Sequence, residues 1–186
     1  MATLRSALAD YFAANGFPAD GGYAATWVPL DFGPLRVYLY NSMARKRAVP
    51  IHDLHHLLTG YATTPSGEAE VAAWEFGAGT WPYWFATVIN LPALGYGVVL
   101  WPGRMWAAFR RGRRMTSLYR QVPLDGAGGL EGWLDLELDD ARMRLPGAQR
   151  SAALDGVVFG CFVVAAFAAL LLPLGALVWA IGSATA

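Results

Sequence analysis

The feature that most constrains this chain is its C-terminal stretch, which carries no charged residue from Gly156 to Ala186. Its apolar run, GVVFGCFVVAAFAALLLPLGALVWAIGS, exceeds the roughly 20 residues that a helix needs to span a bilayer. Such spans tolerate glycine and Pro173, and Trp179 lies near the far end, where interfacial aromatics are common. The run predicts a transmembrane anchor over residues 154–183. The competing interpretation is a core helix buried within a soluble protein.

The arginines just before this run predict its orientation. Arg142, Arg144 and Arg150 precede it, and no basic residue follows. Because positively charged loops stay on the cytoplasmic side, the N-terminal portion is expected in the cytoplasm. The predicted layout is a domain over residues 1–150, large enough for a core of its own, held by a tail anchor in a membrane such as the bacterial inner membrane.

The composition supports contact with a membrane or an apolar ligand. The chain is 55% hydrophobic and 15% charged, where about 25% charged is typical of soluble domains. Its formal net charge is zero, which disfavours a nucleic-acid partner. The single cysteine, Cys161, cannot form an internal disulfide, so nothing in the sequence requires an oxidising compartment.

A second apolar run, TWPYWFATVINLPALGYGVVLWPG, covers residues 80–103. Three prolines and Asn90 interrupt it, and basic clusters lie on both sides. One crossing here would leave one of these clusters on the wrong side of the membrane. We therefore expect a kinked pair of buried helices, or a helix that dips into the bilayer surface, rather than a span over residues 83–101.

The rest of the chain predicts an all-α fold. Apolar residues recur at helical spacing, and no segment shows a strong alternating pattern of strand type. A Gly- and Pro-rich segment, residues 16–35, is expected to be a loop. The predicted helices cover residues 3–14, 36–47, 103–121 and 130–143.

All three histidines lie within residues 52–56, in the sequence HDLHH. On a helix that turns about 100° per residue, His52, Asp53 and His56 share one arc, whereas His55 falls at its margin. Two histidines at positions i and i+4 of a helix can bind one metal ion, as in the HExxH pattern of zinc enzymes. The spacing predicts a metal site here, with Asp53 as a ligand or a base.

Glu68 is a fourth candidate ligand. The loop YATTPS follows the histidine helix, and Glu68 opens the next one. A short connection places antiparallel helices side by side, so Glu68 can close the site. Two histidines and two carboxylates suit Zn²⁺ or another first-row divalent ion. The alternative is that Glu68 is an acid favoured in the first turn by the helix dipole.

Two further features allow alternative interpretations. The basic segment RMWAAFRRGRRMTSLYR is either a solvated helix face or a surface for anionic lipid headgroups. The tryptophans, tyrosines and phenylalanines that follow the histidine motif form either packed core or an apolar pocket for a long-chain ligand.

The segment HDLHHLLTGYATTPSGE resembles the signature of the COQ-four family of ubiquinone (coenzyme Q) biosynthesis proteins, His-Asp-x-x-His, eleven residues, then Glu. His52, Asp53, His56 and Glu68 fit every position of that signature. The segments FGPLRVYLYNSMARKR, FRRGRRMTSLYR and LEGWLDLELDDARMRL also resemble the family, so that the resemblance covers roughly residues 30–146.

The resemblance implies a membrane-associated helical domain that binds a divalent metal, most commonly taken to be Zn²⁺, through His52, Asp53, His56 and Glu68. It implies a role in ubiquinone biosynthesis as a lyase that decarboxylates a polyprenyl hydroxybenzoate precursor, with hydroxylation of the ring carbon. The expected partners are that polyprenylated precursor, membrane lipids, other ubiquinone-biosynthesis enzymes and a second copy of the chain.

A different class of function stays open. The metal would then hold together two helices of a non-catalytic scaffold, which binds the lipid precursor and organises the biosynthetic complex. A membrane-anchored zinc hydrolase fits less well, because the general base of HExxH enzymes is Glu rather than Asp.

Overall fold

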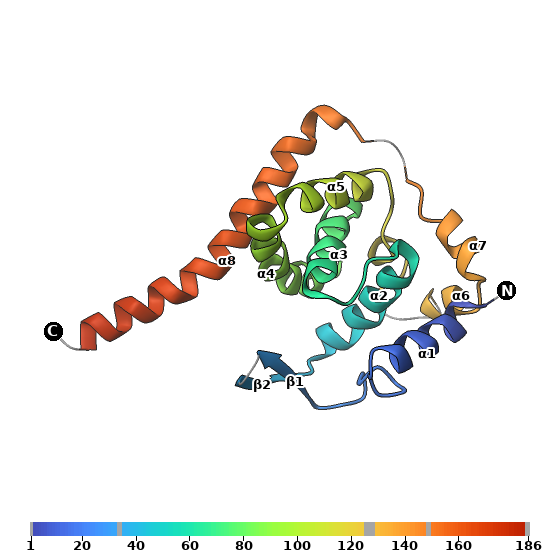
Figure 1. Cartoon of the computed structure of the whole chain (residues 1–186), viewed down its shortest axis with the longest axis horizontal. Helices are drawn as coiled ribbons and strands as arrows, with labels where there is room; N and C mark the ends of the chain where they lie inside the picture. Colours follow the sequence, from blue (N-terminus) through green and yellow to red (C-terminus); the bar gives the residue numbers. More distant parts are fainter. Residues whose placement is uncertain (1, 33–34, 125–128, 148–149, 185–186) are drawn as a thin grey trace.

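Helices make up most of the chain in its computed structural model (Figure 1), as the sequence predicts. The structure describes residues 2–32, 35–124, 129–147 and 150–184. In chain order the elements are α1 (Leu4–Ala14), β1 (Trp27–Phe32), β2 (Leu35–Tyr40), α2 (Met43–Thr59), α3 (Pro65–Ala78), α4 (Trp84–Leu100), α5 (Pro102–Arg113), the short 3₁₀ helix η1 (Leu118–Arg120), α6 (Gly129–Leu134), α7 (Leu138–Met143), the 3₁₀ helix η2 (Ala152–Leu154) and α8 (Asp155–Ala184).

A β-hairpin corrects the all-α prediction. β1 and β2 pair antiparallel with Trp27 opposite Tyr40, and their rings lie 5.4 Å apart. The predicted loop over residues 16–35 and helix over 36–47 are therefore wrong in part, because α2 begins only at Met43. Aromatic and β-branched residues favour strands, and a two-stranded sheet accepts Pro29 because each strand has a free edge.

The core is built around α3, which lies between α2, α4 and α5 in Figure 1. Every residue of α3 from Val71 to Ala78 is buried, so this helix has no solvent-facing side along that stretch. Small residues let α5 approach it closely. A Cβ added at Gly112 of α5 would collide with the carbonyl oxygen of Trp74, and one at Gly77 would collide with that of Phe109.

Replacing Gly112 with alanine is expected to destabilise the protein by about 1–3 kcal/mol or more, because the new methyl group forces α3 and α5 apart. The matched control is Gly103→Ala on the same helix, where an added Cβ meets nothing within 4 Å. Denaturant unfolding in detergent measures both variants. Equal stability of the two would contradict this account of the α3–α5 packing.

Most of the apolar run over residues 80–103 forms one helix, α4, so the kinked pair is the wrong one of the two predicted arrangements. Pro92 lies inside it, and the chain turns at Trp101 into α5. Its 17 residues fall short of the roughly 20 that span a bilayer. One side of α4 packs on α3 and on α8, whereas Trp84, Val88 and Val99 on its outer side are exposed.

One stretch of the described chain is long and apolar enough to cross a membrane, Ala152–Leu172. It consists of η2 and the first part of α8. The first half of α8 packs on the helical body: the rings of Phe162 and Phe76 stack at 4.4 Å, and Ala166 is buried. Its second half extends away from the body (Figure 1). Only 11% of the apolar stretch is buried, unlike a core helix of a soluble protein.

Candidate metal centre

The two histidines of the HDxxH motif lie one turn apart on α2. The Ser42 side chain caps this helix by accepting a hydrogen bond from the backbone N–H of Arg45 at 3.3 Å. Leu54, on the opposite side of α2, is fully buried in the core. Because that apolar side is fixed by packing, the helix presents His52 and His56 together on its other side.

Glu68 lies in the first turn of α3, after a short connection. The Thr64 side chain caps α3 by accepting a hydrogen bond from the backbone N–H of Gly67 at 3.3 Å, and Pro65 occupies the first turn. Gly67 packs so closely on the carbonyl of Ala62 that a Cβ there would collide with it. This tight turn brings the start of α3, and with it Glu68, back to the side of α2.

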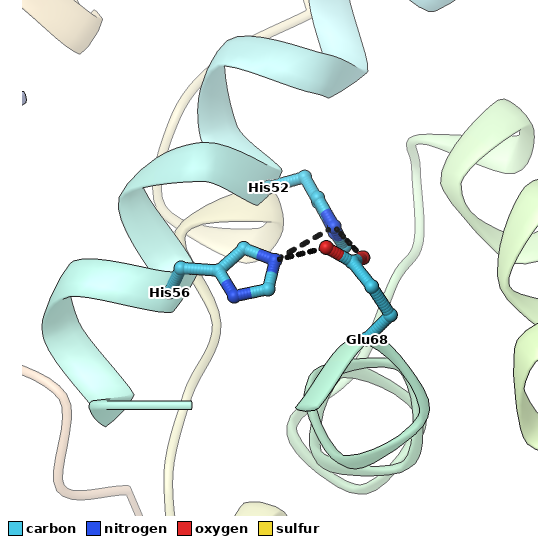
Figure 2. A group of neighbouring side chains, drawn as sticks. All are labelled: His52, His56 and Glu68. Carbon is cyan, nitrogen blue, oxygen red and sulfur yellow. Dashed lines mark hydrogen bonds and ion pairs between the residues drawn. The ribbon is translucent and has the colours of Figure 1, made fainter. Parts of the chain in front are cut away.

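The side chains of His52, His56 and Glu68 converge on one point (Figure 2). The Glu68 carboxylate oxygens lie 3.3 Å from Nε2 of His52 and 3.4 Å from Nε2 of His56. The two Nε2 atoms are 3.2 Å apart. All candidate ligand atoms lie within 4.8 Å of one another, so one ion at their centre can contact all three. Zinc enzymes use the same donor set, two histidines and a glutamate, and keep a position free for water or substrate.

Hydrogen bonds to the other ring nitrogens orient both imidazoles. Nδ1 of His52 lies 3.0 Å from Oε1 of Glu75, and Nδ1 of His56 lies 2.9 Å from the carbonyl oxygen of Tyr61. Both partners are acceptors, so each Nδ1 carries a proton and donates. Metal-binding histidines characteristically have such a partner, which directs the other nitrogen to the ion. Here Nε2 of each ring faces the common centre.

Glu75 is the residue that sequence reasoning missed. It is fully buried on α3, and it accepts hydrogen bonds from His52, from Nδ1 of His55 at 2.6 Å and from the amide of Asn90. Nε2 of His55 accepts a hydrogen bond from the backbone N–H of Leu118. Because one ring nitrogen of His55 donates and the other accepts, this imidazole is neutral. The available signal was an acidic residue within the apolar stretch VAAWEFGAG, two turns after Glu68.

In this cluster, interactions between charged groups shift the pKa values of His52 and Glu75 in the direction opposite to the effect of burial. Burial alone would raise the pKa of Glu75, but the histidines His52 and His55 hold it below its usual range, so Glu75 is an anion. Burial alone would lower the pKa of His52, but Glu75 and Glu68 raise it well above its usual value. Burial also lowers the pKa of His55, in agreement with its neutral form. Without an ion, the Nε2 proton of His52 therefore lies among the candidate ligand atoms.

Metal binding is expected to release a proton, because an ion must displace the Nε2 proton of His52. The raised pKa of His52 determines how zinc affinity depends on pH. Below that pKa the Nε2 proton competes with the metal ion, so the apparent affinity for the ion falls about tenfold for each pH unit of acidification if one proton is released. Calorimetry of zinc binding in buffers of different ionisation enthalpy counts the protons. Binding that is independent of pH and releases none would contradict this arrangement.

Asp53 does not join the three converging residues. Its Oδ2 accepts a hydrogen bond of 2.6 Å from the hydroxyl of Tyr23, on the loop before the hairpin. Burial raises the pKa of Asp53, although the charge of His52 and the Tyr23 hydroxyl act in the opposite direction. The predicted arc of α2 contains all three residues, but adjacent positions diverge by about 100°, which directs Asp53 toward a different neighbour. Its role as a fourth ligand stays a prediction.

The site reaches the protein surface at Glu68, and a pocket lies beside His56. The Glu68 side chain is 37% exposed. A pocket of about 360 Å³ lies beside His56, lined by Tyr11, Asn15 and Tyr61 among others. The Tyr11 ring stacks on the imidazole of His56 with centroids 6.0 Å apart. Burial, and then the carboxylates of Asp53 and Glu68, raise the pKa of Tyr11, so this phenol keeps its proton at neutral pH.

Comparisons with known proteins give no family for the chain. No family model, no curated protein and no solved structure matches it. The candidate metal centre therefore rests on the convergence of His52, His56 and Glu68 and on the hydrogen bonds that orient them.

Proposed function

We propose that this protein is a membrane-bound, metal-dependent decarboxylase of a polyprenyl hydroxybenzoate in ubiquinone biosynthesis. The observation that carries the proposal is the convergence of His52, His56 and Glu68, which fit the spacing of the COQ-four signature. The ion that suits this donor set best is Zn²⁺.

The number of converging residues favours catalysis over a purely structural site. Structural zinc sites use four protein ligands, whereas catalytic sites use three and keep one position for water or substrate. Three residues converge here, whereas Asp53 accepts a hydrogen bond from the hydroxyl of Tyr23. The exposed edge of Glu68 and the pocket beside His56 give a substrate access to that position.

In the proposed step, the bond between the aromatic ring and its carboxylate breaks. Carbon dioxide leaves, the electron pair stays on the ring carbon, and a proton from water takes its place, so this step needs no oxidant. Hydroxylation of the same carbon, which the resemblance also implies, would be a separate step that requires an external oxidant. A bound divalent ion would supply positive charge for the substrate's carboxylate or phenolate oxygen. Glu75 and the Tyr61 carbonyl hold the two imidazoles in place, and the protonated Tyr11 offers a hydrogen bond beside His56.

The polyprenyl tail explains why such an enzyme would lie on a membrane. Shielding a tail from water is worth about 0.8 kcal/mol per buried CH₂ group, so the substrate stays in the bilayer. The exposed apolar residues of α4 and α8, such as Trp84 and Val164, suit contact with that bilayer. The arginines before α8 favour an orientation with the helical body on the cytoplasmic side.

The test uses the full chain in detergent, loaded with zinc and incubated with a polyprenyl hydroxybenzoate. Loss of the carboxylate is followed by mass spectrometry. We expect turnover in the wild type and in Glu70→Gln, a control on the same helix, and none in Glu68→Gln or after removal of zinc. Metal binding without turnover would overturn the enzymatic proposal and favour the scaffold. Full turnover of Glu68→Gln would exclude this site as the catalytic one.

A further inference from the structure

A cluster of arginines lies at the beginning of α8, at the end of α3 opposite to the metal centre. Arg110 and Arg113 of α5, Arg114 directly after α5, and Arg150 line a pocket of about 200 Å³, together with Asp155, the first residue of α8. We call this hollow the arginine pocket. It is independent of His52, His56 and Glu68, and the proposed decarboxylation does not use it.

The arginine pocket carries an excess of positive charge. Its lining has four arginines and one carboxylate, which leaves three positive charges uncompensated within the lining. Asp155 pairs with Arg113 at 2.7 Å, and Arg150 donates to the carbonyl oxygens of Gly77 and Ala78. Those carbonyls fix the position of Arg150 but do not neutralise it. Positive charges held together in this way favour an anion between them.

A second hollow, of about 390 Å³, adjoins the first on the other side of Arg110 and Arg114. Trp106 and Met115 form apolar parts of its wall. The Trp106 ring packs against Phe159 of α8, with centroids 5.3 Å apart. Arg111 also lines this hollow. Arg110 and Arg114 therefore lie between the arginine pocket and a hollow whose wall is only partly apolar, next to the helix that is apolar enough to cross a membrane.

We propose that Arg110 and Arg114 bind the phosphate of an anionic phospholipid, with the remaining arginines of the pocket supporting the charge. Guanidinium groups pair with phosphate oxygens through two parallel hydrogen bonds. A lipid is favoured over a free phosphate because the charge-free run of α8 begins at Gly156, directly after the pocket, and headgroups lie where such a run begins. The partly apolar hollow beside Trp106 then accommodates the glycerol and the upper part of an acyl chain.

The experiment titrates the full chain in neutral detergent with short-chain phosphatidylglycerol, short-chain phosphatidylcholine or inorganic phosphate, and measures binding by calorimetry. The wild type is expected to bind phosphatidylglycerol in preference to the other two, and to lose affinity as salt is added. Each arginine near an anionic headgroup contributes about 1 kcal/mol, so the double variant Arg110→Gln/Arg114→Gln should bind about thirtyfold more weakly.

The matched control is Arg47→Gln/Arg144→Gln, which removes two exposed charges from α2 and from the end of α7. It should bind phosphatidylglycerol as the wild type does. The single variant Arg114→Gln changes an exposed residue and should bind phosphatidylglycerol about fivefold more weakly than the wild type. It replaces the double variant in the test if the double variant does not fold. An equal loss in the control, equal binding of phosphatidylcholine, or equally tight binding of inorganic phosphate would overturn the proposal.

Discussion

Glu75→Ala is expected to lower the free energy of unfolding by about 3–5 kcal/mol, the cost of removing one partner from a buried charged pair. The carboxylate of Glu75 is fully buried and accepts hydrogen bonds from His52, His55 and Asn90. The substitution leaves all three donors without this acceptor in a site packed between α2, α3 and α4. Chemical denaturation of the metal-free protein measures the effect.

Glu70→Ala is the matched control, because it removes a carboxylate from the same helix. Glu70 pairs with Arg104 at 2.5 Å at the edge of the helical body, where the side chain of Arg104 is 50% exposed and that of Glu70 is 14% exposed. Exposed ion pairs contribute about 0–1 kcal/mol, so this variant should remain close to the wild type. If Glu75→Ala and Glu70→Ala were equally stable, Glu75 would not be the buried anchor of the histidines.

Glu68→Ala and His56→Ala are each expected to weaken zinc binding by more than a hundredfold. Loss of a residue that only supports a ligand costs about 10–100-fold in metal affinity, and loss of a ligand itself should cost more. Because Glu68 is 37% exposed, its removal should leave the fold largely intact. Competition with a chromophoric chelator measures the affinity of each variant.

Asp53→Asn distinguishes a site with three protein ligands, His52, His56 and Glu68, from one in which Asp53 is a fourth ligand. The asparagine side chain keeps an oxygen that can accept the Tyr23 hydrogen bond. If Asp53 lies outside the set, zinc affinity should change less than tenfold, as for a supporting group. A loss as large as that of Glu68→Ala would instead make Asp53 a fourth ligand, as the COQ-four signature implies.

The helical positions of the candidate ligands were predictable because they depend on local spacing. His52 and His56 are one turn apart, and any helix over this segment places them on one side. The Thr-Pro sequence before Glu68 is a strong helix start, so the beginning of α3 was also readable. The apolar helix α8 followed from length and lack of charge alone.

Other features depend on contacts between distant segments and were not predictable in this way. Asp53 shares the predicted arc, but its direction depends on Tyr23, thirty positions earlier in the chain. Glu75 looks like an isolated acid in an apolar stretch until α2 and α4 are packed around it. The hairpin of β1 and β2 was not predicted, because Pro29 and the neighbouring glycines suggested a loop.

The metal content of the protein tests the central claim most directly. The full chain is equilibrated with zinc, freed of unbound ion, and measured by elemental mass spectrometry against protein concentration. We expect one zinc ion per chain in the wild type and none in the double variant His52→Ala/His56→Ala. A wild-type protein that retains no zinc or other divalent metal, or a double variant that retains as much as the wild type, would contradict the site.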